Sequence, residues 1–233
     1  MNLLEQSISD ILGLFFPELC VTCGNRLISQ EKYVCFDCWQ DIPATNFHIK
    51  PDNKVAQLFW GRVNISAATS FFSFKKGSKY QLLIHFLKYK GLKELGYETG
   101  KKFGYQLLES PDFTKADVLM PVPLHPKKEK KRGYNQSEWI TRGIAEVLKK
   151  PVDTKTLQRK VFTSTQTKRN RYERWQNVEQ VFGLNDPKAM EHKHILLIDD
   201  VVTTGATLEA CAIHLLKQPG TKVSIATLAY ADI

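Results

Sequence analysis

The sequence predicts an α/β protein, with a parallel sheet flanked by helices and a small N-terminal unit that contains four cysteines. Short aliphatic runs suited to buried parallel strands alternate with longer segments of helical periodicity. The 233 residues are 42% apolar and 11% aromatic, which is typical of a globular chain with one sizeable core. We therefore expect residues 1–64 to form an N-terminal helix, the cysteine unit and a connecting stretch, and residues 65–233 to form the α/β domain.

The first segment, residues 3–16, places apolar side chains at helical spacing before Pro17 interrupts the pattern. It lacks the Lys- and Arg-rich face of a membrane-surface helix, so we expect it to pack on its own neighbour. It carries acids and no basic leader, unlike a secretory signal. No apolar run in the chain approaches bilayer length. These observations predict a cytoplasmic protein without stable membrane insertion.

The cysteine unit consists of two Cys-x-x-Cys pairs, Cys20 with Cys23 and Cys35 with Cys38. Two such pairs supply four thiolates to one tetrahedral ion, and Zn²⁺ is the usual occupant of an all-sulfur site. Reduced core cysteines or redox pairs are the alternative, but a chain without an export signal favours metal. A closed four-sulfur site leaves no position for a substrate. We therefore predict a structural zinc ribbon, too small to fold on a core of its own.

The next part of the chain is predicted to lead from the ribbon into the sheet. The expected elements are a connecting stretch at 41–64, a strand at 67–74 with a turn at 75–78, and helices at about 82–89 and 95–108. Lys88 and Lys90 end the first of these helices. They can contact a phosphate, but a solvated helix end bearing cations is the commoner explanation.

A strand at 117–121 then runs into a proline-rich segment, where proline removes the donors that a sheet needs. The predicted basic loop that follows contains Lys127, Lys128, Lys130, Lys131 and Arg132. Gly133 leads into a helix that extends to about Leu148. A basic loop beside a helix N-terminus is suited to an anion such as pyrophosphate. Solvated surface or a nucleic-acid patch is the alternative.

Two further strands are expected at 152–157 and 178–184, separated by a polar segment. The cations of this segment are Arg159, Lys160, Lys168, Arg169, Arg171 and Arg174. Because it connects two expected core strands, we interpret it as a lid that excludes water from the site. Its Tyr172 and Trp175 equally fit single-stranded nucleic-acid binding through stacking. The sequence leaves both interpretations open.

The central strand is predicted at 195–198 and ends at Asp199 and Asp200. The turn after it contains Thr203, Thr204, Gly205, Ala206 and Thr207. This turn precedes a helix at 208–217 and offers hydroxyls, N–H groups and the positive end of a helix dipole to a phosphate. The carboxylates can accept hydrogen bonds from sugar hydroxyls or hold Mg²⁺ through water. The stretch therefore indicates a sugar phosphate.

This stretch resembles the phosphoribosyl pyrophosphate (PRPP) signature of the type I phosphoribosyltransferases. The resemblance implies a type I phosphoribosyltransferase-like sheet, with Asp199 and Asp200 facing the ribose hydroxyls and residues 203–207 around the 5′-phosphate. It also implies a pyrophosphate site at the first crossing from strand to helix, near Lys131, Arg132 and Gly133. An ordinary strand-turn-helix junction with a threonine N-cap is the alternative.

Motifs in series along nearly the whole chain resemble the ComF family of phosphoribosyltransferase-like proteins, which is associated with natural competence and DNA uptake. The matching motifs are Phe16-Pro17 with the four cysteines, Leu87-Lys88-Tyr89, Pro121-Val122-Pro123-Leu124-His125, Arg132-Gly133-Tyr134-Asn135-Gln136, Gln166 with Arg174-x-x-Asn177 and Phe182, and Asp199 to Thr207. The resemblance implies displacement of pyrophosphate from C1 of Mg²⁺-bound PRPP by a nitrogen nucleophile.

The roles implied by this resemblance follow from charge. The two acids offset positive charge on the ribose, and basic groups stabilise the departing pyrophosphate with Mg²⁺. The basic groups are Arg132 and the lid cations, chosen from Lys168, Arg169 and Arg174. No general base and no acceptor can be named from the residues.

The net charge of +9 suits pyrophosphate and equally suits a nucleic-acid backbone. Two hypotheses from different classes therefore remain. In the first, the protein is a transferase, which the complete acid pair and phosphate turn favour. In the second, it is a non-catalytic module that binds PRPP, single-stranded DNA or proteins of the competence machinery. The ribbon and the excess positive charge favour this second hypothesis, and the fold does not decide between them.

Overall fold

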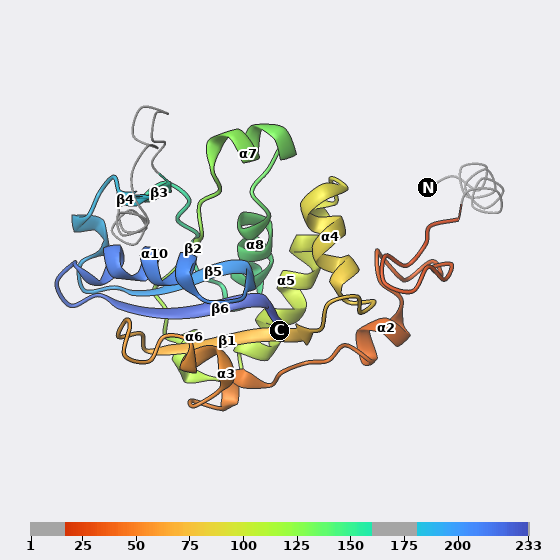
Figure 1. Ribbon diagram of the computed structural model, residues 1–233, viewed down its shortest axis with the longest axis horizontal. Coiled ribbons are helices and arrows are strands. Elements are labelled where there is room, and N and C mark those ends of the chain that lie inside the picture. Colours follow the sequence, from red (N-terminus) through yellow and green to blue (C-terminus); the bar gives the residue numbers. More distant parts are fainter. Residues whose placement is uncertain (1–16, 160–180, 233) are drawn as a thin grey trace.

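The computed structural model describes residues 17–159 and 181–232. Its centre is a four-stranded parallel sheet in the order β1-β6-β5-β2 (Figure 1). The strands of this sheet are β1 (Ala67–Phe74), β2 (Val118–Pro121), β5 (His194–Val202) and β6 (Lys222–Ala231). A separate antiparallel ribbon pairs β3 (Leu157–Arg159) with β4 (Phe182–Leu184). The predicted parallel sheet is confirmed.

Helices cover both faces of this sheet. The helices of the described residues are α2 (Phe36–Gln40), α3 (Lys54–Gln57), α4 (Gln81–Tyr89), α5 (Lys93–Leu107), α6 (Pro111–Thr114), α7 (Pro126–Arg132), α8 (Gln136–Leu148) and α10 (Ala206–Leu216), with short 3-10 turns η1 (Phe47–Ile49) and η3 (Lys188–Met190). Of these, α7 has no buried residue and covers no face of the sheet. Helices α5 and α8 pack very closely because Gly100 and Gly143 lie at their crossing. A Cβ at Gly143 would approach the Tyr97 carbonyl oxygen to 2.1 Å.

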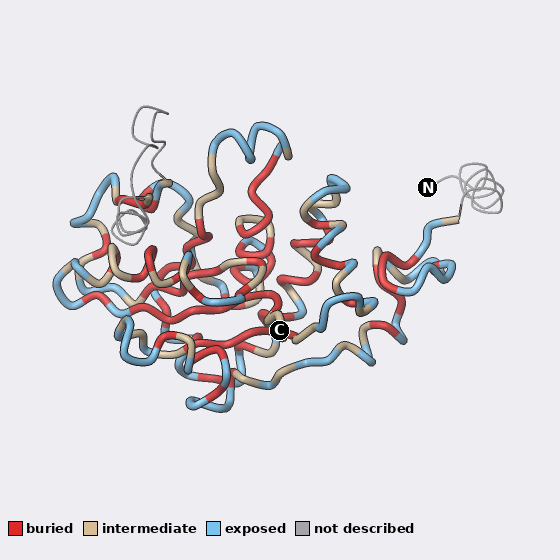
Figure 2. The backbone as a smooth tube through the Cα atoms, viewed as in Figure 1, coloured by how far each residue is buried: buried red, intermediate tan, exposed pale blue. Residues whose placement is uncertain are grey.

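The aliphatic run of β5 explains why this strand is central. Leu196 and Ile198 belong to the core on the α5 and α8 side, whereas Ile195 and Leu197 belong to the core on the α10 side. Successive side chains of a strand point to opposite faces, so a run without polar residues must be covered on both. Figure 2 shows the buried residues concentrated along the strands and the helix faces that cover them.

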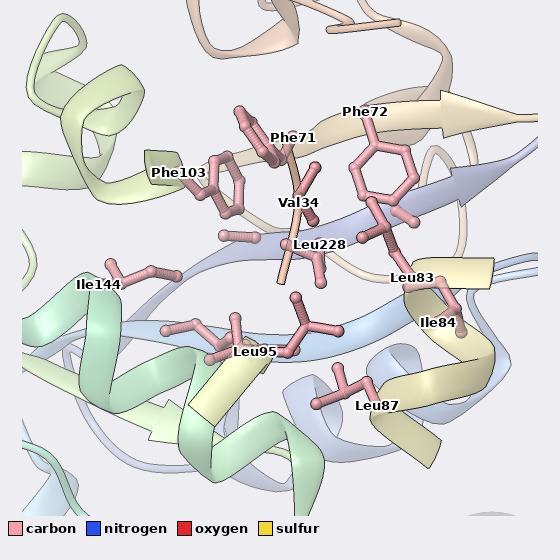
Figure 3. Packing of buried hydrophobic residues seen from close by; sticks show 14 of the residues in the cluster. Val34, Phe71, Phe72, Leu83, Ile84, Leu87, Leu95, Phe103, Ile144 and Leu228 are labelled. Atoms are coloured by element: carbon pink, nitrogen blue, oxygen red, sulfur yellow. The ribbon is translucent and has the colours of Figure 1, made fainter. Parts of the chain in front are cut away.

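The cysteine unit packs onto the same core as the sheet. Cys20, Val34 and Cys38 belong to one cluster with Phe72 and Leu83. Figure 3 shows Val34 of this unit among the buried residues of the sheet and helices. The Tyr80 hydroxyl also donates a hydrogen bond to the Cys38 carbonyl oxygen, at 3.3 Å. The unit therefore depends on the α/β domain for its apolar contacts.

Three local predictions are wrong. β5 does not end at Asp199 and Asp200 but continues to Val202, because β6 runs beside it in register. Residues 127–132 are not a loop: they form α7, which starts at Pro126 and ends where Gly133 takes φ 86°. The strand expected at 152–157 lies instead at β3, and Val152 forms only an isolated bridge with Leu119.

The segment predicted to be a lid also has a different setting. It joins β3 to β4, the two strands of the antiparallel ribbon, rather than two strands of the core sheet. Its residues 160–180 lie outside the described residues, as do residues 1–16, for which a helix is predicted. Strand β6 is a further element that the sequence analysis did not assign, although Lys222–Ala231 is rich in β-branched and apolar residues. In the described part of the chain, no helix has the length and apolarity needed to cross a membrane.

Candidate functional site

The hydroxyl-rich turn lies between β5 and α10, as the sequence predicts. Gly205 caps α10 in the left-handed region at φ 77°, which a residue without a Cβ adopts at little cost. Thr203, Thr204 and Thr207 are exposed beside it. Asp199 and residues 201–208 line a hollow of about 60 Å³. Because the first N–H groups of a helix have no partner within it, this end of α10 can bind an anion.

Arg62 supports this turn from outside the predicted site. Its guanidinium donates hydrogen bonds to the carbonyl oxygens of Thr204 and Leu58, both at 2.9 Å, and pairs with the Glu209 carboxylate on α10. The ring of Phe59 closes the space beside Gly205. The sequence predicts only a connecting stretch at 41–64. No motif spacing reveals a contact between residues 142 positions apart.

The two acids, which lie within β5 near its C-terminal end, have different environments. The Ser137 hydroxyl donates to Asp199 Oδ1 at 2.8 Å, and the Asp200 N–H donates to the same oxygen at 2.9 Å. Burial, reinforced by the negative charge of Asp200, raises the pKa of Asp199 to about 7. Asp200 is itself 4% exposed, and its Oδ2 lies 2.9 Å from Nζ of Lys88.

Lys88 therefore belongs to the site, and the expectation of a merely solvated helix end is wrong for this residue. Its side chain is 24% exposed. The C-terminal end of α4 that carries it is anchored, because the Tyr134 hydroxyl donates a hydrogen bond to the Leu87 carbonyl oxygen. Tyr134 comes just before α8, so α4 and α8 are tied together at the level of the acids.

A second cavity, of about 330 Å³, lies beside this ion pair. It is lined by Lys88, Tyr89, Gly91, Lys128, Lys131 and Arg132. The Arg132 guanidinium lies over the Tyr89 ring at 5.8 Å and donates to the Gln136 side chain. The structure thus brings the predicted pyrophosphate residues Lys131 and Arg132 into the lining of one cavity with Lys88. Gly133 ends α7 next to them.

Apart from the cysteines, the predicted site residues that the structure describes fall into two neighbouring groups. Asp199, Asp200 and the turn 203–207 lie together at the end of β5. Lys131 and Arg132 line the basic cavity, and Lys88 joins that cavity to the acids. The predicted lid residues Lys168, Arg169 and Arg174 lie outside the described residues.

The four predicted cysteine ligands come together. Their Sγ atoms lie within 4.8 Å of one another, which permits one metal ion to bind all four. Burial opposes the thiolate of Cys20, but hydrogen bonds from backbone N–H groups, among them that of Cys35, outweigh this and lower its pKa to about 6. Cys211 lies apart, fully buried on α10.

The chain is similar to several known proteins. A family model described as "Phosphoribosyl transferase domain" matches residues 129–232. The DNA utilization protein YhgH of Escherichia coli O157:H7 is 27% identical over 212 residues, which cover 89% of this chain and 88% of that protein. The competence protein ComFC of Bacillus subtilis (strain 168) is 36% identical over 101 residues, 43% of this chain and 39% of that protein. The family match and the parallel sheet confirm the predicted fold class.

A solved structure of glutamine PRPP amidotransferase from B. subtilis, complexed with ADP and GMP, is also similar. Its TM-score is 0.40 and its sequence is 20% identical, over 56% of this chain and 26% of that one.

Proposed function

We propose that this chain, which belongs to the ComF family of phosphoribosyltransferase-like proteins, binds Mg²⁺-PRPP and transfers its phosphoribosyl group to a nitrogen acceptor. One observation carries the proposal. A hydroxyl-rich helix N-terminus, two acids and a basic cavity lie next to one another at the ends of β5 and α4. A phosphate, a ribose and a pyrophosphate need those three environments in that order.

In this proposal the roles follow from charge and donor type. The turn 203–207 holds the 5′-phosphate through N–H groups and hydroxyls. Asp199 and Asp200 accept hydrogen bonds from the ribose hydroxyls and offset positive charge that develops at C1. Lys131, Arg132 and Gly133 face the pyrophosphate, which is the leaving group. The lid cations Lys168, Arg169 and Arg174 are proposed to complete this wall.

Mg²⁺ is proposed to enter with PRPP. It binds oxygen ligands and keeps much of its water shell, so a pyrophosphate supplies the ligands that it prefers. When bound, it neutralises charge on the leaving group.

Zn²⁺ is proposed to hold the cysteine unit through Cys20, Cys23, Cys35 and Cys38. The four sulfur atoms are close enough for a tetrahedral site, and an all-thiolate donor set favours zinc. The ion is structural, because four protein ligands leave no position for a reacting group.

The transferase proposal is tested by calorimetric titration of Mg²⁺-PRPP into the zinc-loaded protein. The double variant Asp199→Ala, Asp200→Ala is expected to lose about 100-fold or more in affinity, since both sugar-binding acids are gone. Asp52→Ala removes an exposed acid and serves as the control. Equal binding by the double variant contradicts the proposal. If binding holds, acceptor bases are screened by release of pyrophosphate.

A second candidate is a non-catalytic module that binds single-stranded DNA or proteins of the competence machinery. The basic cavity favours it, because the Tyr89 ring is 69% exposed beside several cations and offers a surface for stacking a base. The names of the relatives, a DNA utilization protein and a competence protein, point the same way. A labelled single-stranded oligonucleotide should bind the wild-type protein more weakly as the salt concentration rises. At any one salt concentration, it should bind the double variant Lys128→Ala, Lys131→Ala more weakly than the wild type. Unchanged binding by that variant excludes the cavity as the DNA site.

A further inference from the structure

We propose that Lys88 is a ligand of the pyrophosphate group, held beside the site by Asp200 and released to the substrate when the ribose takes over Asp200. This inference rests on the proposed function and names a residue and an exchange that the function does not require. The main observation is that Lys88 both pairs with Asp200 and lines the basic cavity. Its Nζ lies 2.9 Å from Asp200 Oδ2, and the same residue lines the basic cavity with Arg132.

The backbone around Lys88 is fixed, so the exchange needs only its side chain. Leu87, the preceding residue, is 1% exposed and accepts the hydrogen bond of Tyr134. Gly91 turns the chain toward α5 at φ 74°. The lysine side chain is a long flexible stem with a compact charge, which can rotate between two anions without movement of the helix.

The charges explain why the exchange is favourable. Removing one partner of a buried ion pair leaves the other charge unpaired, which is costly. PRPP brings replacements for both partners together, because its ribose hydroxyls donate to Asp200 while its pyrophosphate oxygens accept from Lys88. A ligand that carries only the ribose half or only the pyrophosphate half replaces one partner and leaves the other alone.

The opposite wall of the cavity supplies the remaining cations. Lys128, Lys131 and Arg132 come from α7 and its end, whereas Lys88 comes from α4. An anion between the two helices is therefore contacted from both sides. The cations of α7 alone would hold it from one side only.

A purely structural role for Lys88 predicts a different ligand dependence. If Lys88 only positions Asp200, its loss should weaken the binding of every ligand that contains ribose. If Lys88 binds the pyrophosphate, its loss should weaken ligands that contain pyrophosphate and spare ribose 5-phosphate. The two roles are separated by comparing Mg²⁺-PRPP, inorganic pyrophosphate and ribose 5-phosphate.

The experiment is calorimetric titration of these three ligands, at one Mg²⁺ concentration, into the wild-type protein, Lys88→Met and Lys90→Met. Lys90 is exposed, caps the same helix and carries the same charge, so it is the matched control. We expect Lys88→Met to lose about 10- to 100-fold in affinity for PRPP and pyrophosphate. We expect its affinity for ribose 5-phosphate to stay the same or rise. Lys90→Met should change the affinity for each of the three ligands by less than about threefold.

Asp200→Asn provides the reciprocal test and a safeguard. It releases Lys88, so pyrophosphate should bind as tightly as to the wild type or more tightly, while ribose 5-phosphate binds more weakly. If Lys88→Met fails to fold because Asp200 is left unpaired, the pair Asp200→Asn and Lys88→Met, Asp200→Asn replaces it. In the protein that carries Asp200→Asn, loss of Lys88 should still weaken the binding of pyrophosphate.

Three results overturn the inference while the proposed function stands. In the first, Lys88→Met weakens the binding of ribose 5-phosphate and of PRPP equally. In the second, that variant binds pyrophosphate as tightly as the wild type. In the third, Lys90→Met changes the affinities as much as Lys88→Met does. Failure of the proposed function looks different: the wild-type protein then binds neither PRPP nor ribose 5-phosphate. Lys88-dependent binding of inorganic pyrophosphate would still support the inference in that case, and its absence would overturn both.

Discussion

The cysteine unit and the site at the end of β5 both gather groups that repel one another, but they do so by different means. Four thiols converge within one short stretch, Cys20 to Cys38, and only a cation can hold four thiolates together. The two acids converge with groups from distant parts of the chain. Lys88 pairs with Asp200, and Ser137 donates to Asp199. In our proposal, the cysteine site depends on an ion from outside, whereas the acid pair has counter-groups within the chain.

The difference has a consequence for stability. A site that needs an ion should lose its structure when the ion is removed, because the binding free energy of the metal is part of the folding free energy. A site with internal partners should keep its shape without substrate and change its affinities when a partner is removed.

Removal of the metal is expected to have the largest effect. Chelation, or Cys38→Ala, should lower the free energy of unfolding by roughly 5 kcal/mol or more, since structural zinc sites in isolated fingers contribute about 10–16 kcal/mol. The loss should spread beyond the unit, because Val34 and Cys38 pack on the same core as Phe72 and Leu83. Thermal unfolding and metal analysis measure the two quantities.

Cys211→Ala is the matched control for this prediction. Cys211 is also a fully buried thiol, but it lies on α10, away from the cluster. Its substitution should leave the metal content unchanged and cost about 1–2 kcal/mol through lost packing. A Cys38→Ala protein with wild-type stability and metal content would contradict the assignment of the four cysteines as ligands.

The same contrast explains which features could be predicted from the sequence. The four cysteines, the phosphate turn and the acids are local patterns, in which the spacing itself expresses the chemistry. Arg62 and Lys88 act on residues more than one hundred positions away. A phosphate contact of Lys88 could be named from the sequence as an alternative, but its partner Asp200 could not, because sequence spacing does not express a contact over that separation. The helix α7 was missed for another reason: its run of cations suggested a loop, whereas Pro126 and Gly133 at its ends favour a short helix.

The strand expected at 152–157 failed because short apolar runs do not identify their partners. Val152 does approach the sheet, but only as an isolated bridge to Leu119, and the chain then pairs β3 with β4. Pairing is decided by tertiary context, which a single strand pattern does not contain.

The next largest effect is expected from Asp199, whose pKa is raised from 3.8 to about 7, first by burial and then by the charge of Asp200. Because the folded-state pKa lies above the unfolded value, the carboxyl contributes its full stability only below about pH 4, and this is lost as the pH rises through 7. Asp199→Asn keeps an acceptor for Ser137 and never ionises. It should therefore match the wild type at pH 4 and exceed its stability by about 2–4 kcal/mol above pH 7.

Thermal unfolding of both proteins between pH 4 and pH 8 measures this difference. The nearby charges that can modify it are Asp200 and Lys88, which the substitution leaves in place. Asp153→Asn is the control, because hydrogen bonds from residues 155 and 156 lower the pKa of Asp153 against the effect of burial. Its stability relative to the wild type should stay nearly constant between pH 4 and pH 8, because a carboxyl with a lowered pKa is largely ionised in both states over this range. A difference for Asp199→Asn that does not vary with pH would show that the carboxyl is already ionised throughout.

The smallest effect on stability, and the most specific one for binding, is expected from Arg62→Ala. Arg62 is 38% exposed, so its loss should cost only about 1 kcal/mol. Its hydrogen bond to the Thr204 carbonyl nevertheless fixes one peptide of the phosphate turn, and a looser turn should bind ribose 5-phosphate about tenfold more weakly. Lys54→Ala, which removes an exposed lysine near Asp232, should change neither quantity measurably.

Arg62→Lys sharpens the argument, because it keeps the charge and loses the planar fork that reaches Thr204 and Glu209 together. If the affinity for ribose 5-phosphate depends on the planar guanidinium, the lysine variant should resemble the alanine variant in calorimetric titrations. If the affinity depends on the positive charge alone, the lysine variant should resemble the wild type. The turn would then be stabilised by electrostatic attraction to residue 62 rather than by a hydrogen bond. In the first outcome, the phosphate site is rigid before its ligand arrives, in contrast to the loss of structure that we predict for the cysteine unit on removal of its metal.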